Sequence, residues 1–376
     1  MIYLDNAATS WPKPEAVYRA VEESLRAAGN PGRGVNQSAL GMSRKVFEAR
    51  TEVAAFFNVP NEERVVFTKN VTEALNIVLK GFLQEGDHVL ISPVEHNSVV
   101  RPLEYLKETK EISYDIIPGD KTGTFDVEEI DKLIRENTKM IVTTHSSNVL
   151  GTILPVQKIS KLAQEHNIYY MIDAAQTAGI LPIDVQDLGV HFLAFTGHKS
   201  LLGPQGTGGL VVNKGINLQP LVHGGTGTNS KVIKQTGLFP DDFESGTQNV
   251  PGIAGLLEGI RYCGNNLEVI RKHELLLMEK LMDYLVSKPE IEVYGPVNIL
   301  EKTGLVTFNV QHLNSANVGQ ILDQEYQIST RTGLHCSPLS HEAAGTLELG
   351  GVRVSVGPFT KEKEIDALVQ ALNEIT

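Results

Sequence analysis

Between residues 64 and 213, short apolar runs alternate with segments patterned as amphipathic helices. The runs are Arg64–Thr68, His88–Ser92, Met140–Thr144, Tyr169–Asp173, Phe192–Thr196 and Gly209–Asn213. Each run is too short for a helix, and the most regular helical pattern of the chain lies between the first two, over residues 71–82. Strands separated in this way by helices predict a mostly parallel sheet that is covered on both faces.

The pattern changes after about residue 262. A long helix carries leucines from Leu267 to Leu285, and Leu305–Val310 and Val352–Val356 then alternate like half-exposed strands. A last helix places apolar residues on one face. We therefore predict a large α/β domain over residues 15–261 and a smaller α+β domain over residues 262–376. Residues 1–14 look irregular, and we expect them to pack near the small domain.

Composition and charge exclude several classes of protein. The formal charge of −12 disfavours a nucleic-acid or an anionic-membrane partner. The two cysteines cannot form a disulfide framework or a four-cysteine metal site, so we expect no metal and a reducing, cytoplasmic setting. No apolar run approaches the length of about 18 residues that a membrane span needs, and no signal-peptide pattern opens the sequence.

A lysine and an aspartate follow two of the predicted strands. Asp173 ends one apolar run, and Lys199 comes just after the run Phe192–Thr196, before a glycine-rich stretch. Ligands of open α/β sheets bind at the carboxyl ends of the strands. A lysine amine and an aspartate for the pyridine nitrogen are what a protein supplies to pyridoxal phosphate. Either residue alone fits an exposed lysine or a capping aspartate, but the pair in this context favours the cofactor.

Three further positions suit the same chemistry. Thr72 opens the helix over residues 71–82, where an anion is favoured, although a plain capping threonine is the alternative. Arg353 alternates with the valines of its strand and, if it points inward, suits a carboxylate. Cys336 lies in the segment Arg331–Pro338, which we interpret as a loop whose arginine and histidine favour a reactive thiol. Cys263, at the end of an apolar helix, is expected to be inert.

Several short motifs occur in an order that is typical of one family. They are DNAAT (Asp5–Thr9), TEALN (Thr72–Asn76), EHNS (Glu95–Ser98), SNVLGT (Ser147–Thr152), IDAAQ (Ile172–Gln176), TGHK (Thr196–Lys199), ESGTQN (Glu244–Asn249) and RTGLHC (Arg331–Cys336). The chain resembles, from end to end, the cysteine desulfurases and selenocysteine lyases of the class V aminotransferase fold, nearest the SufS-type branch. The resemblance implies pyridoxal-phosphate fold type I, with a seven-stranded-type, mostly parallel sheet in the large domain and a small α+β C-terminal domain.

The resemblance also implies a role for each site residue. Lys199 would hold pyridoxal 5′-phosphate covalently, with further contacts from Asp173 at the pyridine nitrogen, Gln176 at the ring hydroxyl, His96 on the ring face, and Thr72, Thr196 and His198 at the phosphate. Thr247 would reach the phosphate of the neighbouring subunit's site in a homodimer. Arg353 and Asn148 would hold the substrate carboxylate, Arg331 and Ala7 would line the same pocket, and Cys336 would accept sulfur.

These residues predict a cysteine desulfurase that converts L-cysteine to L-alanine and leaves a persulfide on Cys336 for an acceptor protein. Lys199 would remove the α-proton, and His96 would shuttle protons. The alternative is a selenocysteine lyase or a cystine or other C–S lyase that needs no persulfide. A sulfur-carrier scaffold without activity is disfavoured by the presence of Lys199, Asp173 and Arg353. Only a short segment separates Arg331 from Arg353, so we expect a short cysteine loop.

Overall fold

The computed structural model describes residues 1–27, 29–31, 36–227 and 231–376. The strands are β1 (Ile2–Tyr3), β2 (Val65–Thr68), β3 (His88–Ile91), β4 (Ser113–Ile116), β5 (Thr138–Thr144), β6 (Tyr169–Asp173), β7 (Phe192–Thr196), β8 (Gly208–Val212), β9 (Ile291–Tyr294), β10 (Leu305–Val310), β11 (Ile328–Ser329), β12 (Arg331–Gly333) and β13 (Gly351–Ser355). The α-helices are α1 (Glu15–Arg26), α2 (Gln37–Phe56), α3 (Val71–Phe82), α4 (Asn97–Lys110), α5 (Glu128–Leu133), α6 (Val156–Glu165), α7 (Val185–Leu188), α8 (Val250–Ser287), α9 (Ser315–Gln324), α10 (Pro338–Ala343) and α11 (Glu362–Ile375).

A seven-stranded sheet forms the centre of the large domain, in the order β2-β8-β7-β6-β5-β3-β4. The neighbours from β7 to β4 run parallel, whereas β8 is antiparallel to both β7 and β2. The predicted mostly parallel sheet is therefore confirmed. The edge strand β4 was not predicted, because its sequence SYDI has no continuous apolar run and its alternation extends over only four residues.

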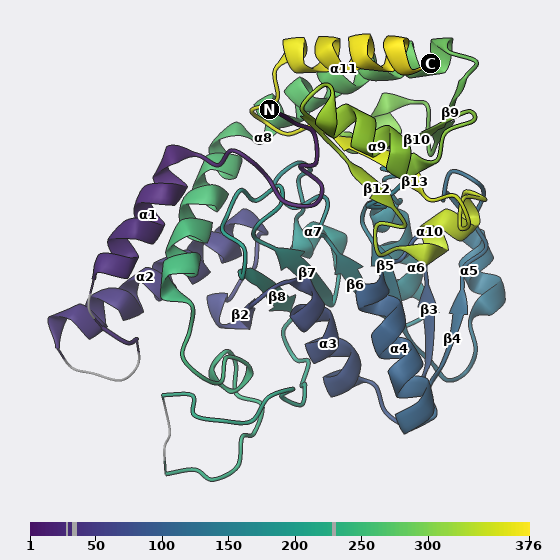
Figure 1. The fold of residues 1–376 in the computed structure, drawn as a ribbon. Helices are drawn as coiled ribbons and strands as arrows, with labels where there is room; N and C mark the ends of the chain where they lie inside the picture. The colour runs from purple at the N-terminus through teal and green to yellow at the C-terminus, as the bar shows by residue number, and fades with distance from the viewer. Residues whose placement is uncertain (28, 32–35, 228–230) are drawn as a thin grey trace.

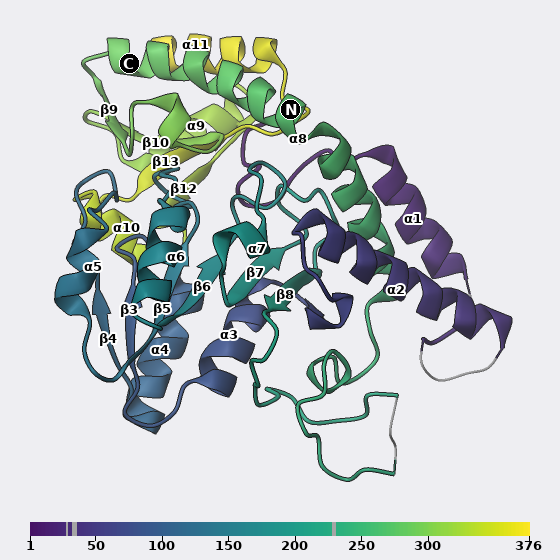
Figure 2. The same cartoon turned by 180° about the vertical axis from the view of Figure 1, so that it is seen from behind.

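Helices cover both faces of this sheet (Figures 1 and 2). Side chains alternate along each strand, so Tyr170 and Ile172 of β6 join a core with α2, α6, α7 and α8. Met171, between them, joins a second core with α3 and α4. Helix α3 buries Leu75 and Leu79 in that second core. Full burial of one such leucine contributes about 1.5–3 kcal/mol.

The small domain contains a four-stranded antiparallel sheet in the order β12-β13-β10-β9. Its core gathers side chains from α8, α9 and α11 against the strands, and both views place α8 and α11 side by side above this sheet. The prediction that β10 and β13 are half-exposed is wrong, since Thr307 and Arg353 are also buried. The reason is that these polar residues face the large domain, where Arg353 Nη1 donates to the Asn148 carbonyl.

Helix α8 passes through both domains without interruption over 38 residues. The boundary expected at residues 261–262 falls inside this helix, and the division into domains stays a prediction. We expected Cys263 to end a helix, and this expectation is wrong. Cys263 lies within α8, because the apolar pattern continues on both sides of it. Cys263 is fully buried, and its Sγ donates to the Ser200 carbonyl at 3.2 Å.

The N-terminal segment contacts both halves of the molecule. Strand β1 pairs in parallel with β11, and Asp5 forms a bridge with Ser355 of β13. The backbone N–H of Ser10 then donates to the His198 carbonyl, in the turn that carries Lys199, at 3.0 Å. Residues before α1 therefore connect the small sheet to the end of β7. No helix in the described ranges is long and apolar enough to cross a membrane.

Candidate active site

The carboxyl ends of β5, β6 and β7 bring two of the predicted residues to one edge of the sheet. In the strand register Thr144 pairs with Asp173, and Asp173 pairs with Ala194 of β7. Lys199 lies in the turn just beyond β7. The Lys199 amine and the Asp173 carboxyl group are near enough for each to affect the pKa of the other. The sheet therefore juxtaposes the two residues that the sequence singled out.

Burial disfavours the charged form of both groups. It lowers the pKa of Lys199 to about 8, and the Arg353 charge acts in the same direction. Burial raises the pKa of Asp173, while the backbone N–H of Ala175, which donates to Asp173 Oδ1 at 2.9 Å, opposes that rise. The second Asp173 oxygen accepts no hydrogen bond from the described residues, and it is therefore free for a ligand.

His96 caps the N-terminus of α4. Its Nδ1 accepts a hydrogen bond of 3.0 Å from the backbone N–H of Ser98. A ring nitrogen that accepts from an N–H carries no proton itself, so the neutral His96 ring is protonated on Nε2. Burial lowers the pKa of His96 to about 4, and the Lys199 and Arg331 charges act in the same direction. The ring is therefore neutral at pH 7.

Thr72 lies in the first turn of α3, beside the His96 segment. The cap of α3 is Asn70, whose side chain accepts from the backbone N–H of Glu73 at 3.0 Å. The Thr72 hydroxyl instead lies 2.7 Å from the Ser98 hydroxyl. The alternative that Thr72 is the helix cap is therefore wrong. The first turn of α3 offers this hydroxyl together with the positive end of the helix dipole, which suits an anion.

The turn after β7 contains Thr196 and His198. The Thr196 hydroxyl reaches the Thr207 carbonyl only at 3.5 Å. The His198 carbonyl accepts from the Thr9 hydroxyl at 3.1 Å, which helps the N-terminal segment to fix the turn. The Nδ1 atom of the His198 ring is buried without a partner in the described ranges, and burial lowers the pKa of this ring to about 4. A buried nitrogen without a partner points to a ligand.

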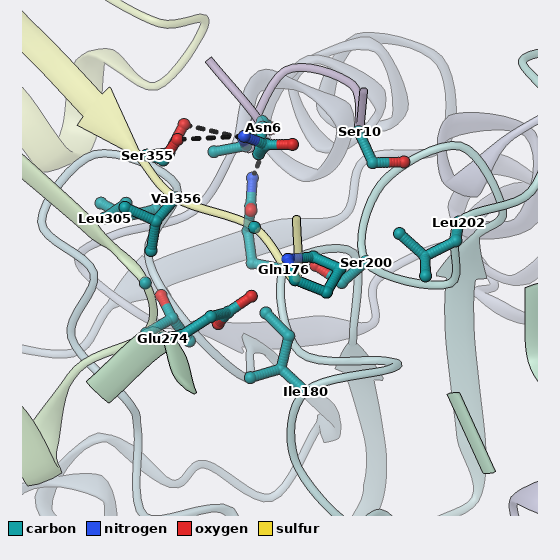
Figure 3. A pocket seen from close by; sticks show the side chains of 15 residues that line it. Asn6, Ser10, Gln176, Ile180, Ser200, Leu202, Glu274, Leu305, Ser355 and Val356 are labelled. Carbon is teal, nitrogen blue, oxygen red and sulfur yellow. Dashed lines mark hydrogen bonds between the residues drawn. The ribbon is translucent and has the colours of Figure 1, made fainter. Parts of the chain in front are cut away.

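Gln176 and Ala7 meet behind this site. Gln176 Nε2 donates to the Ala7 carbonyl at 3.2 Å, and the Ala7 N–H donates to the Ser355 hydroxyl at 2.9 Å. Figure 3 shows the adjoining cavity, whose volume of about 20 Å³ holds about one water molecule and is too small for a cofactor. Glu274, on the wall of that cavity, is 2% exposed, and burial raises its pKa to about 8.

Arg353 is fully buried and makes two hydrogen bonds of 2.8 Å. Its Nη1 donates to the Asn148 carbonyl, and its Nη2 donates to Asp5 Oδ1. Its Nε is buried without a partner among the described residues. In the pairing of β12 with β13, Arg331 lies directly opposite Arg353. The site therefore presents two arginines side by side, and among the residues that the structure describes only Arg353 pairs with a carboxylate.

Arg331 also contacts the candidate sulfur acceptor. Its Nη2 donates to Cys336 Sγ at 3.7 Å, and Cys336 is exposed. This exposure leaves Cys336 accessible from solvent. Of the two cysteines, only Cys336 combines exposure with a neighbouring cation.

Hydrogen bonds hold the segment around Cys336 against the large domain. Asn148 Nδ2 donates to the His335 carbonyl at 2.8 Å, and the Asn97 N–H donates to the Cys336 carbonyl at 2.9 Å. The Ser337 hydroxyl donates to the Glu95 carbonyl, also at 2.9 Å. His335 and Cys336 have φ angles of 52° and 59°, a left-handed conformation that costs about 1–2 kcal/mol for each such residue. These bonds fix a backbone that would not adopt this shape unaided.

Two expectations for this segment are wrong. Residues Arg331–Pro338 are not entirely a loop, because Arg331–Gly333 form the edge strand β12 and α10 begins at Pro338. Strand β12 forms because it pairs with β13, a contact that the glycine and the proline of the segment do not indicate. His335 adds no positive charge, since it is 2% exposed and burial lowers its pKa to about 3. Arg331 is thus the only one of the two expected cations that is charged at pH 7.

Thr247 is not brought to this site within the chain. It is exposed in the segment before α8, and in the described ranges no hydrogen bond joins it to the residues named above. Glu244 anchors the beginning of this segment by a buried ion pair with Arg50, 2.7 Å between Nη1 and Oε1. The expectation that Thr247 serves a neighbouring subunit stays a prediction.

The structure adds residues to the site that the sequence reasoning missed. Asp5 and Ser98 lie in motifs quoted above, but no role was predicted for either. Asp5 contacts Arg353 across a long sequence separation, and the contact of Ser98 with His96 depends on side-chain orientation. His341 contacts His335 and carries no motif signal. Among the residues described, no three His, Cys, Asp or Glu side chains are placed to hold a metal ion.

Comparisons with known proteins agree with this geometry. Residues 2–368 match the aminotransferase class-V family. A probable cysteine desulfurase of Methanothermobacter thermautotrophicus is 37% identical, covering 100% of this chain and 94% of that protein. A cysteine desulfurase of Pectobacterium atrosepticum is 32% identical, covering 100% and 93%. The apo structure of a cysteine desulfurase from Thermococcus onnurineus superposes with a TM-score of 0.93 at 33% identity, covering 100% and 94%.

Proposed function

The chain belongs to the aminotransferase class-V family, and we propose that it is a cysteine desulfurase that uses pyridoxal phosphate and carries sulfur on Cys336. The observation that carries this proposal is the placement of an exposed cysteine, 3.7 Å from the Arg331 guanidinium, on a segment bonded to the Asn148 and His96 loops. An ordinary aminotransferase has no use for such a thiol. The fold alone would not decide between these activities.

The buried groups at the sheet edge fit the cofactor. Lys199 supplies an amine whose pKa of about 8 leaves part of it unprotonated, and therefore nucleophilic, near neutral pH. Asp173, which is 3% exposed, supplies a carboxyl group that would suit a protonated pyridine nitrogen. Gln176 would reach the ring hydroxyl, and the neutral His96 ring would lie on the ring face. When bound, pyridoxal phosphate withdraws electrons from the α-carbon of an amino acid.

The first turn of α3 and the turn after β7 supply donors for the phosphate. Thr72 and Thr196 offer hydroxyl groups there, and the His198 Nδ1 lacks a partner among the described residues. Thr247 of a neighbouring subunit would complete this set, so we propose that the protein acts as a homodimer. The exposure of Thr247 and its distance in sequence from Lys199 support this assignment.

The substrate carboxylate would bind beside Arg353 and Asn148, with Arg331 and Ala7 at the same pocket. Arg353 already directs two N–H groups to Asp5 and to the Asn148 carbonyl, which fixes its plane. Its unpaired Nε and the neighbouring Arg331 remain for a carboxylate. A planar guanidinium held in one orientation selects this group by geometry as well as by charge.

Two residues move protons in the proposed reaction. Lys199 would hold the cofactor, and its Nζ, when it is free, would take the proton from the substrate α-carbon. His96 carries its proton on Nε2 because Nδ1 is occupied by the Ser98 N–H. The neutral His96 ring can therefore direct a hydrogen bond from Nε2 toward the substrate. To pass that proton on, the ring must receive another proton in exchange, because otherwise it would become an imidazolate anion.

Cys336 then attacks the substrate sulfur as a thiolate. The Sγ–S bond forms while the bond between the substrate sulfur and its β-carbon breaks, and the carbon skeleton keeps the electron pair of the broken bond. Proton uptake by that skeleton completes L-alanine, so cysteine and the enzyme thiol give alanine and an enzyme persulfide. The exposure of Cys336 lets a sulfur-acceptor protein reach the persulfide.

The test compares the wild type with Cys336→Ala, on L-cysteine and on L-selenocysteine. We expect the variant to lose alanine production from cysteine, because a thiol leaves poorly unless a nucleophile takes the sulfur. Production from selenocysteine should fall less, since selenolate leaves more readily. Cys263→Ala is the matched control and should behave as the wild type. If Cys336→Ala retains the wild-type rate on cysteine, a C–S lyase without a persulfide replaces the proposal.

A further inference from the structure

Two histidines and a threonine form a buried chain of hydrogen bonds behind Cys336. His335 Nδ1 lies 3.2 Å from His341 Nε2, and His341 Nδ1 lies 2.8 Å from the Thr346 hydroxyl. At the other end, His335 Nε2 lies 3.3 Å from the Arg331 carbonyl. The three side chains are at most 2% exposed. Figures 1 and 2 show α10, which carries His341, just below β12 and β13.

The direction of every hydrogen bond in this chain is fixed by its last acceptor. The Arg331 carbonyl can only accept, so His335 must carry its proton on Nε2. His335 Nδ1 then accepts, which requires the proton of His341 to be on Nε2. In a neutral His341, Nδ1 in turn accepts from the hydroxyl of Thr346 at 2.8 Å, and that hydroxyl also lies 3.4 Å from the His341 carbonyl. All three side chains are satisfied as neutral groups, and burial, which lowers the pKa of His341 to about 4, favours the same state.

One end of this hydrogen-bond chain involves the two residues that position the reactive sulfur, His335 and Arg331. His335 directly precedes Cys336, and both have left-handed backbones. The Arg331 carbonyl belongs to the residue whose guanidinium donates to Cys336 Sγ at 3.7 Å. Thr346 is itself held, because its N–H donates to the His341 carbonyl at 2.7 Å. The hydrogen-bonded residues Arg331, His335, His341 and Thr346 thus hold both the left-handed backbone of Cys336 and the guanidinium beside its thiol.

We propose that His341 is a positioning residue for Cys336: through His335 it holds the left-handed backbone of the cysteine and the Arg331 guanidinium in register for attack on sulfur. This inference rests on the proposed function. It assigns a task to α10, whose Ser340 hydroxyl also donates to the Val94 carbonyl at 3.2 Å. Neither histidine acts by titration, because the hydrogen-bond chain requires both rings to be neutral.

The first measurement reads the tautomers without any substrate. In protein labelled with nitrogen-15 histidine, we expect the His335 and His341 rings to be neutral, with the proton on Nε2, throughout pH 6–8. Assignment by the variants His335→Gln and His341→Gln identifies the signals. A protonated His341, or one with its proton on Nδ1, would overturn the proposed direction and with it the role of His341.

The second measurement is the rate at which iodoacetamide alkylates Cys336, followed by peptide mass spectrometry. His341→Phe keeps the ring volume but removes both nitrogens, and we expect alkylation and kcat for cysteine to fall by about 10-fold or more, with KM little changed. His341→Gln restores a donor toward His335 and should recover alkylation to within about threefold of the wild type.

His88→Phe is the matched control. His88 is also fully buried and also bonds a threonine hydroxyl at 2.8 Å, that of Thr138, but it lies in β3, outside the Cys336 segment. It should leave Cys336 alkylation within about twofold of the wild type, as distant sites act independently. An equal fall in both phenylalanine variants, or no rescue by His341→Gln, would show a merely structural role. Because alkylation and tautomers need no turnover, an inactive wild type would refute the desulfurase proposal and leave this test intact.

Discussion

Arg353 Nη2 donates to Asp5 Oδ1 at 2.8 Å, so a carboxylate of the N-terminal segment neutralises a guanidinium buried in β13. We expect Asp5→Asn to lower the free energy of unfolding by about 1–3 kcal/mol, because a buried charge loses its counterion. Urea unfolding measures this. The control Glu22→Gln, which breaks an exposed ion pair with Arg26, should cause no measurable change. Equal stability of Asp5→Asn and the wild type would contradict the assignment.

The buried Glu274 predicts a pH dependence of stability. Its pKa rises from 4.5 to about 8 on folding, so the folded protein binds one more proton than the unfolded chain between these values. Stability should therefore fall as the pH rises from about 5 to 8. Glu274→Gln should remove this cost and raise the unfolding free energy at pH 8 by about 1–3 kcal/mol, with little effect at pH 5. A variant that is less stable at pH 8 would refute the prediction.

Lys199 is expected to be indispensable. Lys199→Ala should lose the visible absorption of lysine-bound pyridoxal phosphate and all turnover of cysteine, because both the covalent link and the α-proton base are removed. Spectra and alanine assays measure the two effects. Lys69→Ala, at a largely exposed lysine, is the control and should retain both. Full cysteine turnover in Lys199→Ala would overturn the cofactor assignment.

The shared-site prediction can be tested by complementation. Thr247→Ala and Lys199→Ala homodimers should both be impaired, the first through weaker cofactor binding. Refolding the two variants together should restore activity, because each mixed dimer contains one site with an intact Lys199 and a Thr247 from the other subunit. Absence of recovery in mixed dimers, with dimers shown by sedimentation, would mean that Thr247 does not act across an interface.

The sequence patterns predicted the sheet well because buried parallel strands are continuous apolar runs. Tyr169–Asp173 and Phe192–Thr196 match β6 and β7, and the helical spacing predicted α3 over residues 71–82. The strands β4 and β12 were not predicted, because both are short and only partly buried and so carry no continuous apolar run. The burial of Arg353 was not predicted either. Alternation along β13 shows that the two faces of the strand differ, but not that its polar face is covered by another domain.

The sequence predicted those site residues that lie in recognisable motifs, but not the contacts between them. Asp173 and Lys199 were found because strand ends of a parallel sheet converge. The Arg353–Asp5 pair and the hydrogen-bonded chain from Thr346 to Arg331 depend on contacts between segments with no periodic signal. The charge expected on His335 was wrong for the same reason, since its burial is a property of the packing around α10. The roles given to the site residues stay predictions.

The central claim is that Cys336 carries the sulfur, and peptide mapping tests it most directly. The wild-type holoenzyme is treated with L-cysteine, alkylated and analysed by mass spectrometry while alanine is counted in the same sample. We predict one added sulfur atom on the Cys336 peptide, none on the Cys263 peptide, and alanine formed in at least equal amount. Alanine produced with no added sulfur on Cys336, or at the wild-type rate by Cys336→Ala, would contradict the account.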